Sequence, residues 1–148
     1  RFQKQIELSG IKKENDRKKE FLNRYQEALR DEKRAEEEIE TYRIKAMFPQ
    51  SQEISDMPKG SGGQQDLSTY AADVDEMLHE LRNCMDECLK LRTEIVTAIE
   101  QIPNVTERCI LKYRYIDGLK WSAIADRMDY NRQHVLKIHG RALFNLDI

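Results

Sequence analysis

Residues 121–143, WSAIADRMDYNRQHVLKIHGRAL, hold the pattern that decides the fold of this chain. Two helices that cross at a steep angle need a small side chain at the crossing and apolar side chains one turn away on either side. Ala125 is the small residue, and the apolar positions around it are Ile124, Met128, Tyr130, Val135 and Ile138. This spacing predicts a helix-turn-helix unit within residues 104–148.

The predicted turn between the two helices is Asp129-Tyr130-Asn131. Asp129 stands where glycine is the usual choice, so we expect it to take a left-handed conformation, which Asp tolerates better than most residues. Asn131 is expected to cap the helix that follows.

The second helix of the unit has two faces. Val135, Ile138 and Ala142 are expected to face inward. The first two turns then present an outward group that a recognition helix would place against base edges in the major groove. Its members are Arg132, Gln133, Leu136 and Lys137.

Two apolar stripes precede this unit, and both alternate spacings of four and three residues, as amphipathic helices do. The first is Phe21, Tyr25, Ala28, Glu32, Ala35, Ile39, Tyr42 and Ala46, in which Glu32 alone is charged; the second is Tyr70, Val74, Met77, Leu81, Cys84, Cys88, Leu91, Ile95, Ala98 and Ile102. We predict helices over about 12–47 and 68–102, joined by a flexible linker over about 49–66 that is rich in Gly, Pro, Ser and Gln.

The chain is therefore predicted to be all-α, with a long two-helix antiparallel hairpin in residues 1–103 and a C-terminal helix-turn-helix domain in residues 104–148. Asp66 or Ser68 is expected to cap the second long helix, and Thr106 the helix after Pro103. Helices this thin and polar rarely bury enough area alone, so the hairpin is expected to serve oligomerisation, most simply as a homodimer.

Charge is unevenly distributed along the 148 residues. Residues 1–48 carry 13 Lys and Arg against 11 Asp and Glu, residues 49–103 carry 4 against 11, and residues 104–148 carry 8 against 5. The basic excess coincides with the predicted helix-turn-helix, as expected for a module that docks on nucleic acid.

No apolar run approaches the ~20 residues of a membrane span and no signal-peptide pattern opens the chain, so we expect no membrane partner and a cytoplasmic protein.

Residues 106–143 resemble region 4 of bacterial sigma factors, which reads the upstream promoter element, and residues 131–143, NRQHVLKIHGRAL, align with that family's recognition helix without a gap. The whole chain, including SDMPKGSGG at 55–63 and YRYIDG at 113–118, further resembles the small sigma-like proteins of Gram-positive phages and prophages, among them the ArpU and RinA type regulators of late genes. The resemblance implies binding to double-stranded DNA in a bacterial host cell, with RNA polymerase as a further candidate partner.

The resemblance also implies the DNA-binding residues. By position, the base readers are Arg132, Gln133, Leu136 and Lys137, with Arg141 and His134 toward phosphate and Asn131 as the cap. Gln133 stands where sigma factors commonly have Glu, and Leu136 where they have Arg, so the promoter sequence read is expected to differ. Glutamine pairs with adenine, arginine with guanine, and an apolar side chain packs on the thymine methyl group. Lys120 is a third departure, because a Ser or Thr cap is more usual before Trp121.

Other residues have simpler interpretations. Tyr113, Tyr115, Trp121 and Tyr130 fall at or beside apolar positions, which favours packing over base stacking. For Arg108, Lys112 and Arg114 two interpretations stay open: contact with phosphate, or a solvated position on the surface. Cys84 and Cys88 lie one turn apart and can share a metal with Cys109 or a histidine, but both fall in the apolar stripe, which favours packing. We therefore expect no metal, no cofactor and, without a nucleophile and base pattern, no enzyme activity.

Three functions remain from different classes. A sequence-specific DNA-binding transcription regulator, an activator of phage late genes at promoters, is favoured. A small terminase-like DNA-packaging subunit also combines a helix-turn-helix with long oligomerising helices, and it would assemble as a ring. A structural or adaptor protein would use the helix-turn-helix for protein contacts, and it predicts no salt-dependent DNA affinity.

Overall fold

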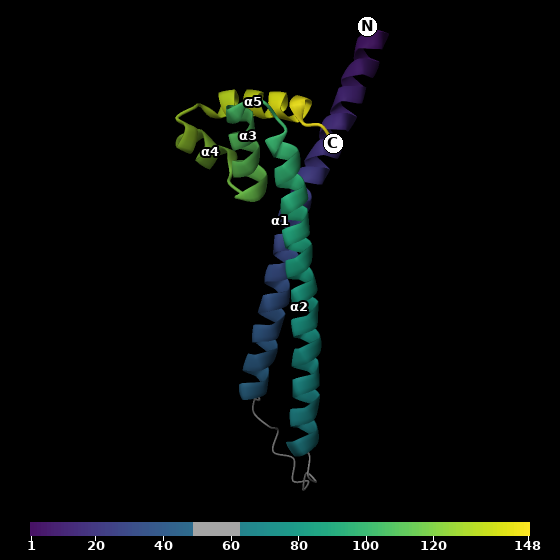
Figure 1. The fold of residues 1–148 in the computed structure, drawn as a ribbon, viewed down its shortest axis with the longest axis vertical. Coiled ribbons are helices and arrows are strands. Elements are labelled where there is room, and N and C mark those ends of the chain that lie inside the picture. The colour runs from purple at the N-terminus through teal and green to yellow at the C-terminus, as the bar shows by residue number, and fades with distance from the viewer. Residues whose placement is uncertain (49–62) are drawn as a thin grey trace. The chain divides into compact units, whose positions relative to one another are not determined.

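The computed structural model describes residues 1–48 and 63–148, with side chains for 1–48 and 67–148. All regular structure in these residues is helical, which confirms the all-α prediction. The elements are α1 (Phe2–Met47), α2 (Gly63–Glu100), α3 (Val105–Leu111), a π-helical turn η1 (Lys112–Ile116), α4 (Trp121–Met128) and α5 (Arg132–Asn145) (Figure 1). No helix within the described ranges is long and apolar enough to cross a membrane.

The two long helices begin earlier than the sequence predicted. α1 begins at Phe2 rather than near residue 12, because residues 2–11 contain no proline and Gly10 costs only about 1 kcal/mol relative to alanine. α2 begins at Gly63, so the end of the predicted linker is helical and neither Asp66 nor Ser68 lies at the start of the helix. The rest of the predicted linker, residues 49–62, lies outside the described residues.

Residues 1–28 and 88–148 form one compact unit, and residues 29–87 form a second. The first unit contains all of the C-terminal helices together with parts of α1 and α2, so it includes residues from both sides of the boundary predicted at residue 103. The candidate site lies within this first unit.

The larger core of the first unit joins α1 and α2 to the C-terminal helices. Leu22 of α1 and Ile95 and Ile99 of α2 are fully buried. They pack with Ile102, Leu111, Tyr115, Ala142, Leu143 and Leu146. Each fully buried Leu or Ile side chain contributes about 1.5–3 kcal/mol, so this shared core is the main apolar attachment of the C-terminal helices.

The buried stripe of α2 departs from the predicted one near its end. Ile99 is fully buried, whereas Ala98, the predicted stripe position, is only half-buried. A strict alternation of four and three residues drifts around a helix of 3.6 residues per turn by ~20° per heptad. The inward-facing position therefore moves by one residue over the length of α2.

A smaller core lies between α3, α4 and α5. Its buried members are Ile110, Ile124, Ala125, Val135 and Ile138, with Tyr113, Leu119, Trp121 and Met128 packed against them. The small Ala125 and the inward positions of α5 are as predicted. The prediction that Tyr130 is a buried position is wrong. Its side chain is 38% exposed, and its ring lies edge-on to that of His134. Tyr130 follows the end of α4, so helical spacing no longer sets the direction of its side chain.

Two polar side chains of α1 also hold the first unit together. The Lys18 ammonium, on a residue only 8% exposed, donates to the Leu143 carbonyl of α5 at 2.8 Å. Gln26 Nε2 donates to the carbonyl of Ile116 at 2.8 Å and to that of Tyr115 at 3.2 Å. Carbonyl groups near helix ends lack intrahelical donors, and a cation at the C-terminal end of a helix is favoured by the helix dipole. α1 therefore caps both α5 and η1.

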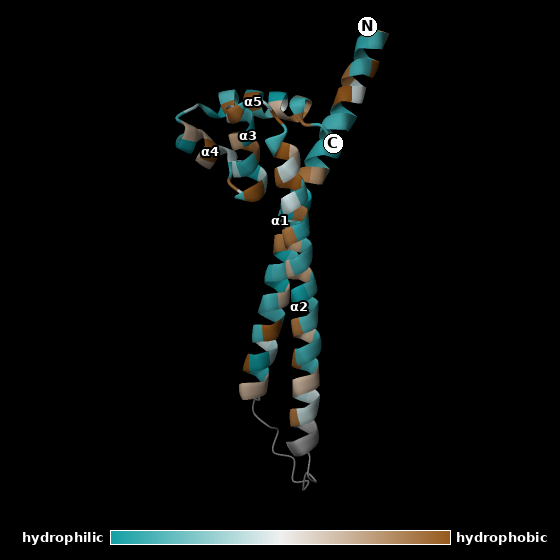
Figure 2. Ribbon diagram, viewed as in Figure 1, coloured by the Kyte–Doolittle hydropathy of each residue, from teal (hydrophilic) through white to brown (hydrophobic). Residues whose placement is uncertain are grey.

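In the second unit, Tyr42 links α1 to α2. Its hydroxyl donates to Asp73 Oδ2 at 2.5 Å, and its ring stacks on Tyr70 with centroids 5.5 Å apart. The hydrogen bond to the Asp73 carboxylate raises the pKa of Tyr42 above its ordinary value. The stripe residues Ala35 and Ile39 are only half-buried, and Figure 2 shows the apolar positions of both long helices interrupted by hydrophilic ones.

Among the glycines that the structure describes, Gly118 has the backbone conformation that requires glycine. Its φ is +69°, and a Cβ there would lie 2.9 Å from Gln26 Oε1. We predict that Gly118→Ala lowers the free energy of unfolding by about 1–2 kcal/mol, the cost of a left-handed conformation for an L-residue. Urea titration of the full chain measures this change.

The matched control is Gly10→Ala in α1, where a Cβ meets nothing within 4 Å and the backbone is helical. This substitution should stabilise the helix, by up to about 1 kcal/mol. Equal stability changes in the two variants would contradict the role given to Gly118.

Candidate nucleic-acid interface

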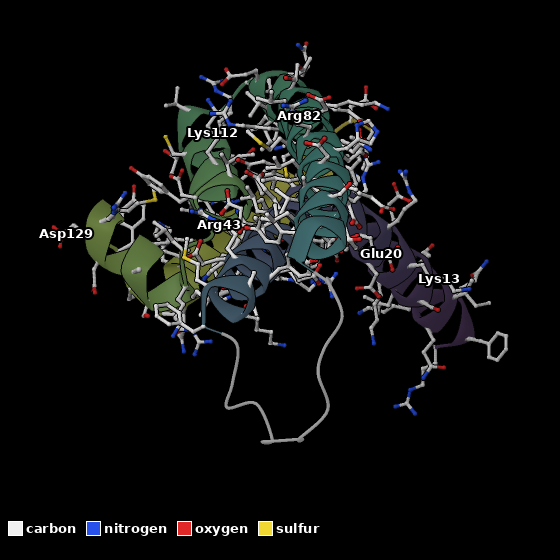
Figure 3. The ribbon with its side chains drawn as sticks, turned by 90° about the horizontal axis from the view of Figure 1, so that it is seen from below. Lys13, Glu20, Arg43, Arg82, Lys112 and Asp129 are labelled. Atoms are coloured by element: carbon white, nitrogen blue, oxygen red, sulfur yellow. The ribbon has the colours of Figure 1, made fainter. Side chains whose placement is uncertain are left out.

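The connection between α4 and α5 is made by Asp129, Tyr130 and Asn131. Asp129 has φ 55° and ψ 41°, so the predicted left-handed conformation is confirmed. The Asn131 side chain accepts a hydrogen bond from the His134 backbone N–H at 2.8 Å, which confirms it as the cap of α5. Figure 3 shows Asp129 at the margin of the C-terminal helices. Local backbone chemistry therefore fixes the angle at which α5 leaves the turn.

Two other helix starts differ in how they are capped. Lys120 precedes α4 without a side-chain cap, as expected for a residue that cannot accept a hydrogen bond. α3 is capped by Asn104, whose Oδ1 accepts from the Glu107 backbone N–H at 3.1 Å. Thr106, the predicted cap, lies inside α3. Both residues are good caps, and the extended backbone of Asn104 decides between them.

α5 separates the predicted DNA-binding residues from its packing face. Val135, Ile138 and Ala142 are buried. The cap and the six predicted contact residues on the helix are exposed: Asn131, Arg132, Gln133, His134, Leu136, Lys137 and Arg141. One helix therefore brings cationic, amide and apolar groups to solvent together.

The cations on this surface have no partners among the residues that the structure describes. In the part of the chain that the structure describes, the side chains of Arg132, Lys137 and Arg141 form neither an ion pair nor a hydrogen bond, and the first turn of α5 has no acidic residue. An exposed cation without an internal partner needs no existing contact broken before it meets an anion. The exposed face of α5 is therefore suited to an anionic ligand.

Three other basic residues of the C-terminal segment do have internal partners. Arg108 donates to the carbonyls of Ile102 and Pro103, and Lys112 pairs with Glu100. Arg114 donates to the Leu119 carbonyl at 3.0 Å and lies over the Trp121 ring. The sequence left open whether Arg108, Lys112 and Arg114 contact phosphate or are solvated. The structure favours structural roles for all three, because each forms contacts with other residues of the chain.

His139 is a buried histidine behind the exposed face that was not predicted from the sequence. Its Nε2 forms a hydrogen bond with the Tyr115 hydroxyl at 2.8 Å, and its ring packs edge-on against Trp121. Burial lowers the pKa of His139 to about 4, with the charges of Lys19 and Arg114 adding to the effect, and burial raises the pKa of Tyr115 to about 12. The signal was available, since His139 lies four residues after Val135 and one after Ile138.

His139 connects the two cores of the first unit. Tyr115 belongs to the larger core and Trp121 packs against the smaller one. The neutral imidazole therefore lies where the two cores meet and supports α5 from its inner side.

No protein-family model, curated protein or solved structure matches this chain. A function is therefore proposed from its own residues, their geometry and the resemblance described in the sequence analysis.

His139 makes stability depend on pH. Its folded pKa of about 4 lies below the ordinary value of 6.5, so the unfolded chain binds a proton more readily between these values. The full contribution is present above pH 6.5 and is lost as pH falls toward 4. We predict a loss of roughly 2–3 kcal/mol over this window from His139 alone. Urea unfolding at several pH values between 4 and 7.5 measures it.

The control is His139→Gln, which keeps a polar group near the Tyr115 hydroxyl but does not titrate. Its stability should fall less between pH 6.5 and 4 than that of the unaltered protein. Parallel pH profiles for the two proteins would show that His139 does not carry the dependence.

Proposed function

We propose that this protein is a sequence-specific, duplex-DNA-binding transcription regulator, in which α4, the turn at residues 129–131 and α5 act as a helix-turn-helix. The observation that carries the proposal is the exposed face of α5. There Arg132, Lys137 and Arg141 have no partners within the described ranges of the chain, and they lie beside the exposed side chains of Gln133 and Leu136. This combination suits a polyanion whose bases also offer hydrogen-bonding edges and methyl groups.

The dimensions of α5 support a place in the major groove. The groove is about 12 Å wide, and a helix with its side chains is about 10–12 Å across. The 14 residues of α5 make it roughly 20 Å long. Arg132 at its first turn then pairs with guanine, Gln133 with adenine, and Leu136 packs on a thymine methyl group. Lys137, Arg141 and His134 face phosphate.

The biological setting of the proposal comes from the sequence resemblance. By that resemblance the protein activates phage late genes at promoters in the bacterial cytoplasm, with RNA polymerase as a further partner. We also propose that α1 and α2 form an antiparallel hairpin through which two copies of the chain dimerise. A dimer would read two half-sites related by its two-fold axis. A larger ring in solution would favour the DNA-packaging alternative instead.

Two alanine substitutions test the reading surface. Lys137→Ala should weaken binding to all duplexes and reduce the slope of log affinity against log salt by about one, because one phosphate contact is lost. Arg132→Ala should in addition relax the base preference at one position, a discrimination of ~1–3 kcal/mol. Fluorescence anisotropy with a selected duplex and with scrambled duplexes measures both effects over a range of salt.

Lys33→Ala is the matched control, because Lys33 is an exposed lysine of α1 in the other unit. It removes the same charge and should leave the affinity and the salt slope unchanged. If all three variants bind like the unaltered protein, the exposed face of α5 is not the DNA-binding surface.

A further inference from the structure

Gly140 lies in the interior of α5, at a position where no contact within the described residues requires glycine. A Cβ added at Gly140 would meet nothing within 4 Å, and Gly118 alone among the glycines described has a positive φ. Neither packing nor backbone conformation therefore requires glycine at this position. Glycine in a helix interior costs about 1 kcal/mol relative to alanine. On an exposed helix face, a position without a side chain leaves room for another molecule to approach the backbone closely.

The position of Gly140 on α5 identifies the surface concerned. Residues three and four apart lie on the same face of a helix, so Gly140 continues the exposed line of Leu136 and Lys137 by one turn. The buried Val135, Ile138 and Ala142 lie on the other side. Gly140 is exposed and falls between Lys137 and Arg141, whose side chains have no partners within the described residues. The exposed backbone at Gly140 therefore lies between two cationic side chains, those of Lys137 and Arg141.

We propose that Gly140 is the point of closest approach between the backbone of α5 and a DNA strand, and so acts as a steric determinant of DNA binding. This inference rests on the proposed function and adds a residue that no charge or hydrogen-bonding pattern would reveal. Glycine allows a backbone to come close to a ligand because it has no Cβ. Lys137 and Arg141 then reach phosphates on either side of the contact. A side chain at position 140 would hold α5 away from the strand and lengthen these contacts together with those of Gln133 and Leu136.

Gly10 in α1 provides the comparison inside the same molecule. A Cβ at Gly10 also meets nothing within 4 Å. Its neighbours one turn away include the exposed apolar Ile6 and the exposed Lys13, and α1 is not part of the proposed DNA-binding surface. Gly10→Ala therefore makes the same chemical change in a helix interior away from the proposed DNA contact.

The experiment compares Gly140→Ala, Gly140→Leu and Gly10→Ala in the full chain. Each is measured by urea unfolding and by anisotropy with one duplex at several salt concentrations. Alanine and leucine are good helix formers, so all three variants should be at least as stable as the unaltered protein. Affinity should fall about 5-fold or more for Gly140→Ala and further for Gly140→Leu, as expected for forcing extra methyl groups into a close contact. The salt slope should fall by less than about one, because Lys137 and Arg141 keep their charges near the strand even when their phosphate contacts lengthen.

The outcomes separate this inference from the proposed function. DNA binding by Gly140→Leu at the unaltered affinity would overturn the inference and leave the proposed function standing. An equal loss of affinity in Gly10→Ala would also overturn it, because the effect would not belong to α5. If the unaltered protein binds no duplex even at low salt, both fail. A loss confined to position 140 and increasing from alanine to leucine, in proteins of undiminished stability, supports the inference.

Discussion

The attachment of α5 to the N-terminal part of α1 is the interaction on which the first unit depends. Leu22 is fully buried in the larger core, and Lys18, one turn earlier, donates to the Leu143 carbonyl near the end of α5. Neither contact is available to an isolated C-terminal segment. The apolar burial supplies most of the stabilisation, and the buried ammonium group fixes the register because it must have an acceptor. The end of α5 is thereby held against α1.

This attachment uses the inner face of α5 and leaves the outer one exposed. Val135, Ile138 and Ala142 take up the apolar side of the helix, and His139 fills the place where the two cores meet. The cationic and amide side chains on the outer face are exposed to solvent. A helix held at its inner face, capped at its start by Asn131, presents its outer groups in a fixed arrangement. Such preorganisation reduces the entropy that binding must overcome.

The features that the sequence predicted well are local ones. The inward positions of α5, the left-handed Asp129 and the Asn131 cap follow from helical period and from hydrogen bonds between residues three apart. Contacts between distant segments had no such signal. Nothing local indicates that Gln26 donates to the end of η1, or that Lys18 meets α5. Tyr130 and Thr106 were misassigned at helix ends, where period gives no direction and neighbouring residues compete as caps.

The central claim is that the exposed face of α5 binds duplex DNA while its inner face stays packed. Amide chemical shifts of the isotope-labelled full chain, followed during titration with a duplex, test it most directly. The account predicts that the largest shifts fall on residues 131–141, with little change at buried Leu22 and Ile95. Shifts confined to the second unit, or no shifts at any duplex concentration, would contradict it.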